Sequence, residues 1–189
     1  MTTEQKDILI KKYEDFSSED NPERKKLLRF EIFNILKELD SPETNDFHIW
    51  GLTYYMSDDD KEYHTNLALE KFLKAYELDS TNFLACLYVA HCLHDKGELD
   101  QALKYYEQVN KEDLKEFRIW RYVKLIEQIG FCNYRLGNKD IGRKRFQEVL
   151  EWYRKLPMED RVAPTELIQC LPESDEIVIE MKKIEDYLN

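Results

Sequence analysis

The sequence predicts an all-α fold of about eight or nine helices joined by short turns. Glycine and proline are scarce, with five of each among 189 residues, which disfavours a β-sandwich with many turns. Apolar residues recur at spacings of three and four along most of the chain, which is typical of helices with one buried face. Capping signals rich in Asp, Asn, Ser and Pro separate these segments. No segment predicts a strand convincingly.

The helix boundaries follow from these signals in chain order. "SSEDNPER" supplies a cap and then a proline in the first turn, and "DSPE" at residues 40–43 repeats the pattern. Breaks are expected at 79–82, 95–98, 110–113, 136–140 and 156–160. The four helices expected before the first of these breaks cover 3–16, 22–39, 42–57 and 62–78. A less clear segment follows Pro164, and the last helix is expected near 174–188.

Composition narrows the class of protein. The formal charge of −11 disfavours general nucleic-acid binding, although residues 111–156 carry twelve basic against seven acidic side chains. No stretch approaches the roughly 18–20 apolar residues that span a bilayer, and the N-terminus lacks a signal-peptide core. We therefore expect a cytoplasmic protein. Four cysteines without paired spacing are expected to be reduced thiols in the core: Cys86, Cys92, Cys132 and Cys170.

Two segments of the chain are alike without a gap. When residue 83 is aligned with residue 123, large, small and turn residues fall opposite one another along both segments. The matched pairs are Cys86 and Ile126, Val89 and Ile129, Ala90 and Gly130, Gly97 and Gly137, Ala102 and Gly142, Tyr106 and Phe146, and Val109 and Val149. Small residues suit a close crossing of two helices, and glycine suits a turn with positive φ.

This pattern resembles the tetratricopeptide repeat, a helix–turn–helix of 34 residues. The resemblance covers about residues 45–156 as three units, at about 45–80, 83–113 and 114–156. It implies one domain over 1–189, a right-handed α-solenoid of antiparallel helical hairpins. Residues 1–40 would form an N-terminal hairpin, and 160–189 a C-terminal cap. The two turn glycines lie 40 residues apart rather than 34, so the helix beginning near Leu114 is expected to be lengthened.

In this family the first helices of successive hairpins line a concave groove that holds peptides or partner helices. The resemblance therefore implies a binding groove with side chains from all three units. The groove residues are His48, Leu52 and Tyr55 from the first unit, Leu84, Leu87, Tyr88, His91 and His94 from the second, and Lys124, Glu127, Gln128, Phe131 and Arg135 from the third. The lysine and asparagine clamp of the chaperone-binding members is absent, so an Hsp70 or Hsp90 cochaperone is not expected.

The stretch "HCLHD" at 91–95 is the strongest candidate for a chemical site. His91 and His94 lie one turn apart and share a helix face, whereas Cys92 lies about 100° away. Three zinc ligands do not converge from one helix in this way, so we favour groove-lining histidines and a packed cysteine over a metal site. Phosphate-binding loops, nucleophile elbows and HExxH are absent. We expect neither a cofactor nor an enzyme.

Three functions stay open at this point. The first is an adaptor or chaperone-like module that binds another protein in its groove, as a monomer or weak homodimer. The second is an inhibitor, such as an immunity protein that neutralises a basic toxic enzyme through its acidic surface. The third is RNA binding through the basic band and its aromatic residues, which include Trp120, Tyr122, Phe131 and Tyr134. The sequence favours the first.

Overall fold

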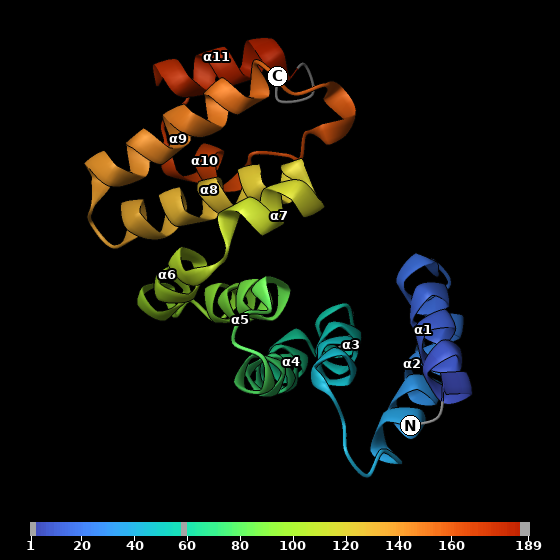
Figure 1. Cartoon of the computed structure of the whole chain (residues 1–189). Coiled ribbons are helices and arrows are strands. Elements are labelled where there is room, and N and C mark those ends of the chain that lie inside the picture. Colours follow the sequence, from blue (N-terminus) through green and yellow to red (C-terminus); the bar gives the residue numbers. More distant parts are fainter. Residues whose placement is uncertain (1–2, 58–59, 186–189) are drawn as a thin grey trace. The chain divides into compact units, whose positions relative to one another are not determined.

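The computed structural model describes residues 3–57 and 60–185, and within them the chain is all-α, as predicted (Figure 1). These residues form eleven α-helices and one short 3-10 helix, Met158–Asp160, and contain no strand. The expected count of eight or nine helices is therefore wrong. Contacts divide the chain into two compact units, Met1–Lys96 and Gly97–Asn189, and each unit is described by itself.

The two additional helices arise in the second unit. The lengthened helix expected near Leu114 is instead a pair, α7 (Lys111–Phe117) and α8 (Ile119–Arg135). Asn110 starts α7 early because its side chain accepts hydrogen bonds from the amides of residues 112 and 113. Arg118 then adopts an extended conformation, with φ −159° and ψ 113°, and ends it. The second addition is α10 (Thr165–Cys170), in the segment that follows Pro164.

The first unit begins with a helical pair, α1 (Thr3–Ser18) and α2 (Pro22–Lys37). Their facing side chains form a core that also receives Ile49 from α3 (Thr44–Tyr55). The buried core residues are Leu9, Phe16, Leu28, Ile32, Leu36 and Ile49. A salt bridge of 2.8 Å between Lys6 and Glu43 also links α1 to the start of α3. The N-terminal pair is therefore docked on the first helix of the predicted repeats.

The rest of the first unit is a run of three packed helices, α3, α4 (Lys61–Leu78) and α5 (Phe83–Asp95). α3 and α4 approach each other closely at Gly51, where a Cβ would lie 2.6 Å from the ring of Phe72. The missing side chain therefore makes room for the fully buried ring. Asn82 caps α5 by accepting a hydrogen bond of 2.9 Å from the amide of Ala85.

In the second unit, α8 contacts α6 (Leu99–Gln108), α7, α9 (Lys139–Tyr153) and α10, while α11 (Glu176–Ile184) packs on α9 (Figure 1). α8 and α9 cross at two facing glycines. A Cβ on Gly142 would lie 2.7 Å from the carbonyl oxygen of Gly130. The predicted turn glycines also have the expected left-handed backbone, with φ 77° at Gly97 and 92° at Gly137.

Three of the four cysteines, Cys86, Cys92 and Cys132, are buried and free, as the sequence predicts, whereas Cys170 is half-buried. Their burial raises the pKa of the thiol, to about 11 for Cys86 and about 12 for Cys132. Buried thiols of this kind are protonated and unreactive at neutral pH. Across residues 3–57 and 60–185, no helix combines the length and apolar character that crossing a bilayer requires.

Gly142→Ala is expected to lower the free energy of unfolding by roughly 1–3 kcal/mol, because the added methyl group meets backbone atoms rather than a movable side chain. In an open helix the same change would be stabilising by about 0.5–1 kcal/mol. Chemical denaturation followed by circular dichroism measures the difference, with the exposed Lys144→Ala on α9 as control. A Gly142→Ala variant as stable as the parent protein would contradict the close crossing of α8 and α9.

Candidate functional site

The first unit contains a cluster of five ring side chains, which we name the aromatic cluster: His48, Tyr55, Phe72, Tyr88 and His91. Tyr88 lies at its centre. Its ring stacks on Phe72 with centroids 5.0 Å apart and meets His48, Tyr55 and His91 edge-on at 5.5, 5.8 and 5.5 Å. Four of the five are predicted groove residues, and the structure brings these four together.

Helix geometry explains why the rings converge. His48 and Tyr55 are seven residues apart on α3, and Tyr88 and His91 are three apart on α5, so each pair shares a helix face. Phe72 from α4 lies beneath them and also contacts His48, with centroids 5.5 Å apart. His48 is buried, whereas Tyr55, Tyr88 and His91 are half-buried. The cluster is therefore a supported aromatic surface rather than a closed core.

A polar group closes one end of the aromatic cluster. The hydroxyl of Tyr55 donates a hydrogen bond of 3.0 Å to Oδ2 of Asp95, and Nζ of Lys61 lies 3.9 Å from the same oxygen. Burial, together with the charge of Asp95, raises the pKa of Tyr55 well above its ordinary value. The phenol is therefore neutral at physiological pH and serves as a donor and a contact surface rather than as a base.

The other predicted groove residues of the first unit differ in exposure. Leu52 and Leu87 are buried, so they belong to the core rather than to an accessible surface. Leu84 and His94 are half-buried. An aromatic surface with aliphatic support is typical of the centre of a protein interface.

"HCLHD" takes the helical arrangement that its spacing predicts. Cys92 is fully buried, and burial raises the pKa of its thiol, whereas His91 and His94 are half-buried. Within the part of the chain that the structure describes, no group of three or more His, Cys, Asp or Glu side chains could hold a metal ion. His91 is instead part of the aromatic cluster, where its ring contacts Tyr88.

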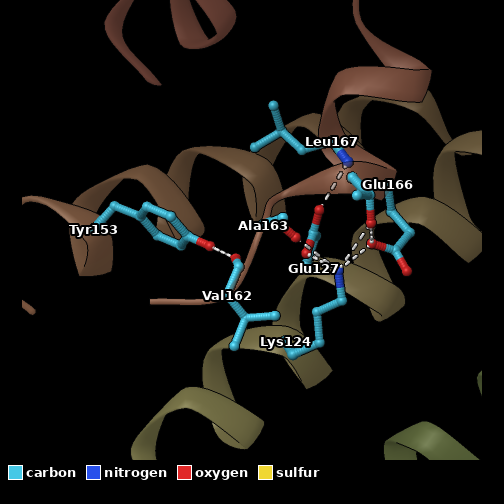
Figure 2. A network of polar contacts seen from close by, with 8 residues as sticks. Lys124, Glu127, Tyr153, Val162, Ala163, Glu166 and Leu167 are labelled. Carbon is cyan, nitrogen blue, oxygen red and sulfur yellow. Dashed lines mark hydrogen bonds and ion pairs between the residues drawn. The ribbon is translucent and has the colours of Figure 1, made fainter. Parts of the chain in front are cut away.

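The second unit contains a network of polar contacts around Lys124 on α8 (Figure 2). Its ammonium group lies 2.8 Å from Oε2 of Glu127 and also donates to the carboxylate of Glu166. It donates further hydrogen bonds of 3.1 Å to the carbonyl of Ala163 and 3.2 Å to the hydroxyl of Thr165. One lysine thus ties the chain that enters α10 to the surface of α8.

Glu127 is the buried member of this network. Its side chain is 1% exposed, and Oε1 accepts a hydrogen bond of 2.9 Å from the amide of Leu167. Burial raises the pKa of Glu127 to about 7, although Lys124 opposes the shift. In Glu166, burial is outweighed by Lys124, which holds the pKa of that carboxyl below its ordinary value. Lys124 is therefore neutralised mainly by Glu166, while Glu127 titrates near neutrality.

This network covers groove residues predicted in the third unit. Lys124 and Glu127 lie under the chain's own residues 163–167, and Gln128 and Phe131 are buried. Only Arg135 is exposed, and its guanidinium lies 5.3 Å from the ring centroid of Phe131. In the described structure these side chains, apart from Arg135, are not presented to a partner.

The sequence predicted a C-terminal cap over 160–189 but not α10 or the groove residues that it covers, because this segment lacks the repeat signature. A signal was nevertheless present, since the buried residues Pro164, Leu167 and Leu171 follow one another at spacings of three and four. Tyr153 strengthens the attachment by donating its hydroxyl to the carbonyl of Val162. The segment is thus fastened to both α8 and α9.

Comparison with known proteins adds no relative. No family model matches the chain, and no curated protein is significantly similar to it. The likeness to the tetratricopeptide repeat therefore rests on the residue pattern and on helix pairs that cross closely at glycine.

The free energy of unfolding is expected to fall as the pH rises from about 5 to about 7, because folded Glu127 binds its proton more tightly than the unfolded chain does. This contribution is complete below 4.5, the ordinary pKa of the carboxyl, and is lost above about 7. Its size is on the order of 3 kcal/mol, at about 1.4 kcal/mol for each unit of the pKa shift from 4.5 to about 7.

Glu127→Gln should remove this pH dependence, even if the variant differs from the parent protein in stability. Its side-chain amide oxygen can still accept the hydrogen bond from the amide of Leu167, but the side chain no longer titrates. Urea denaturation at several pH values measures it, with the exposed Glu151→Gln as control. If Glu127→Gln kept the full slope, another group would be responsible for the pH dependence.

Proposed function

We propose that this protein is a scaffold of the tetratricopeptide-repeat type that binds a segment of a partner protein on the aromatic cluster. The helical pairs and the close crossings at Gly51 and between Gly130 and Gly142 support the repeat assignment. The left-handed turns at Gly97 and Gly137 also support it. A right-handed solenoid is the architecture that this assignment implies.

The observation that carries the proposal is that half-buried Tyr55, Tyr88 and His91 converge with buried His48 in one cluster of rings. Rigid aromatic rings supply large contact areas at a small cost in conformational entropy. They are enriched at the centres of interfaces, where a few residues account for most of the binding energy. The phenol and imidazole groups around Tyr88 would orient a bound segment through hydrogen bonds.

The proposal places binding in the first unit rather than along the whole predicted groove. Glu127, Gln128 and Phe131 are buried in the described structure, and half-buried Lys124 is engaged by residues 163–166, which leaves Arg135 as an exposed groove residue of the third unit. A partner that needed the buried side chains would have to displace the residues around α10. That displacement would break the contacts of Lys124 and Glu127, so we propose the aromatic cluster as the primary site.

A second candidate function is inhibition of a basic enzyme by an immunity-type protein. The formal charge of −11 favours it, because opposite charges accelerate encounter and select the partner. The two candidates differ in their dependence on salt. Binding led by charge weakens as ionic strength rises, whereas binding led by buried aromatic surface changes little.

Tyr88→Ala is expected to weaken partner binding by about 2 kcal/mol, the cost of removing a hot-spot aromatic residue. Affinity capture from the lysate of the source organism at low and moderate salt measures the loss. The exposed Tyr63→Ala on α4, outside the cluster, is the control, and thermal unfolding checks that both variants fold. If the Tyr88→Ala variant instead retained a single basic partner that salt releases, that result would favour the inhibitor and contradict binding through the aromatic cluster.

A further inference from the structure

The first unit also contains a pocket that is lined by none of the residues of the aromatic cluster. It has a volume of about 200 Å³ and lies among the end of α1, the start of α2 and the end of α3. Its apolar lining comes from Phe16, Pro22 and Met56, and its cationic lining from Lys25, Lys26 and Arg29. We name it the cationic pocket. Its positive side chains stand out in a chain whose formal charge is −11.

The sequence places the three cations on one side of α2. Lys25, Lys26 and Arg29 follow Pro22 by three, four and seven residues, which are the spacings of one helix face. Pro22 begins the helix, and Asn21 caps it by accepting a hydrogen bond of 3.0 Å from the amide of Arg24. The first turn of this helix therefore adds positive potential beside the pocket.

One lining residue of the cationic pocket, Phe16, also belongs to the core of the first unit. Phe16 is 1% exposed, and Nζ of Lys25 lies 5.6 Å from the centroid of its ring. Lys26 pairs with Glu23 at 3.1 Å, but both side chains are exposed, at 56% and 84%. An exposed pair of this kind is weak and can exchange for another carboxylate.

Size and chemistry define what the pocket accepts. A cavity of about 150 Å³ with an apolar lining accepts a benzene ring, so this one has room for one large apolar side chain. The surrounding ammonium and guanidinium groups select carboxylates next to that side chain. Ser57, also in the lining, donates its hydroxyl to the carbonyl of Thr53 at 2.8 Å.

We infer that the cationic pocket anchors a short acidic segment of a partner protein, with one large apolar side chain inserted and flanking carboxylates on Lys25, Lys26 and Arg29. Charge complementarity argues for a segment rather than a large acidic surface, because the rest of the chain is acidic and would repel such a surface. The inference rests on the proposed partner-binding function but concerns a separate site with different chemistry.

The test uses the full-length protein, labelled with nitrogen-15, and a capped peptide in which three glutamates flank a single phenylalanine on each side. Saturable amide shifts are expected around Lys25, Arg29 and Met56. Affinity should fall by roughly three- to tenfold in Lys25→Gln/Arg29→Gln, the effect of losing two charge pairs at half-buried side chains. Lys37→Gln, which removes an exposed lysine from the same helix but not from the pocket, should bind normally.

Two altered peptides separate the contributions of shape and charge. Replacing the phenylalanine by alanine, or the glutamates by glutamine, should each weaken binding. No shifts at millimolar peptide, or equal affinity for the glutamine peptide, would overturn the inference. If 3-phenylpropionate bound as tightly as the peptide, the pocket would be a site for small carboxylates and not for a segment.

The same titration distinguishes this inference from the proposed function. Tyr88→Ala should leave peptide binding to the cationic pocket unchanged, since Tyr88 does not line it. Shifts that centred on Tyr88 instead would assign the peptide to the aromatic cluster and overturn the inference. If Lys25→Gln/Arg29→Gln had no effect on peptide binding, the proposal of partner binding through Tyr88 would still stand. If Tyr88→Ala had no effect on partner binding, the inference of peptide binding in the cationic pocket would still stand.

Discussion

The constraint on which both units depend is the close approach of paired helices where a side chain is missing. In the first unit the absence of a Cβ at Gly51 admits the ring of Phe72, and that ring is the base on which Tyr88 stacks. In the second unit Gly142 faces the backbone at Gly130. A side chain at these glycine positions would push the paired helices apart, and the surfaces that the helices support would lose their shape.

The Lys124 network attaches residues 163–167 to α8 through charged groups that are partly or fully removed from water. Removing carboxylates from water is unfavourable, and the raised pKa of Glu127 reflects that cost. Hydrogen bonds from Lys124 and from the amide of Leu167 offset part of it. The outcome is a covered face on α8, stabilised by groups that would otherwise have been available to a partner.

The two candidate sites of the first unit use different physics. The aromatic cluster offers ring side chains, for which burial of apolar surface is the main source of affinity. The cationic pocket combines a small apolar cavity with three positive side chains, for which charge selects the ligand. The residues of the first site were named from the sequence because the resemblance to the tetratricopeptide repeat selects His48, Tyr55, Tyr88 and His91 as groove residues. The second was not, because α2 resembles no repeat and its solvated lysines look ordinary in sequence.

The sequence by itself determined the helical class, most helix boundaries and the turns at Gly97 and Gly137, because these depend on local spacing, caps and backbone freedom. Only the tertiary structure decided that residues 163–167 cover Lys124 and Glu127, about forty positions earlier in the chain. It also decided that α1 and α3 complete a pocket beside Lys25. Such contacts depend on docking between distant segments, where burial and charge outweigh any local preference.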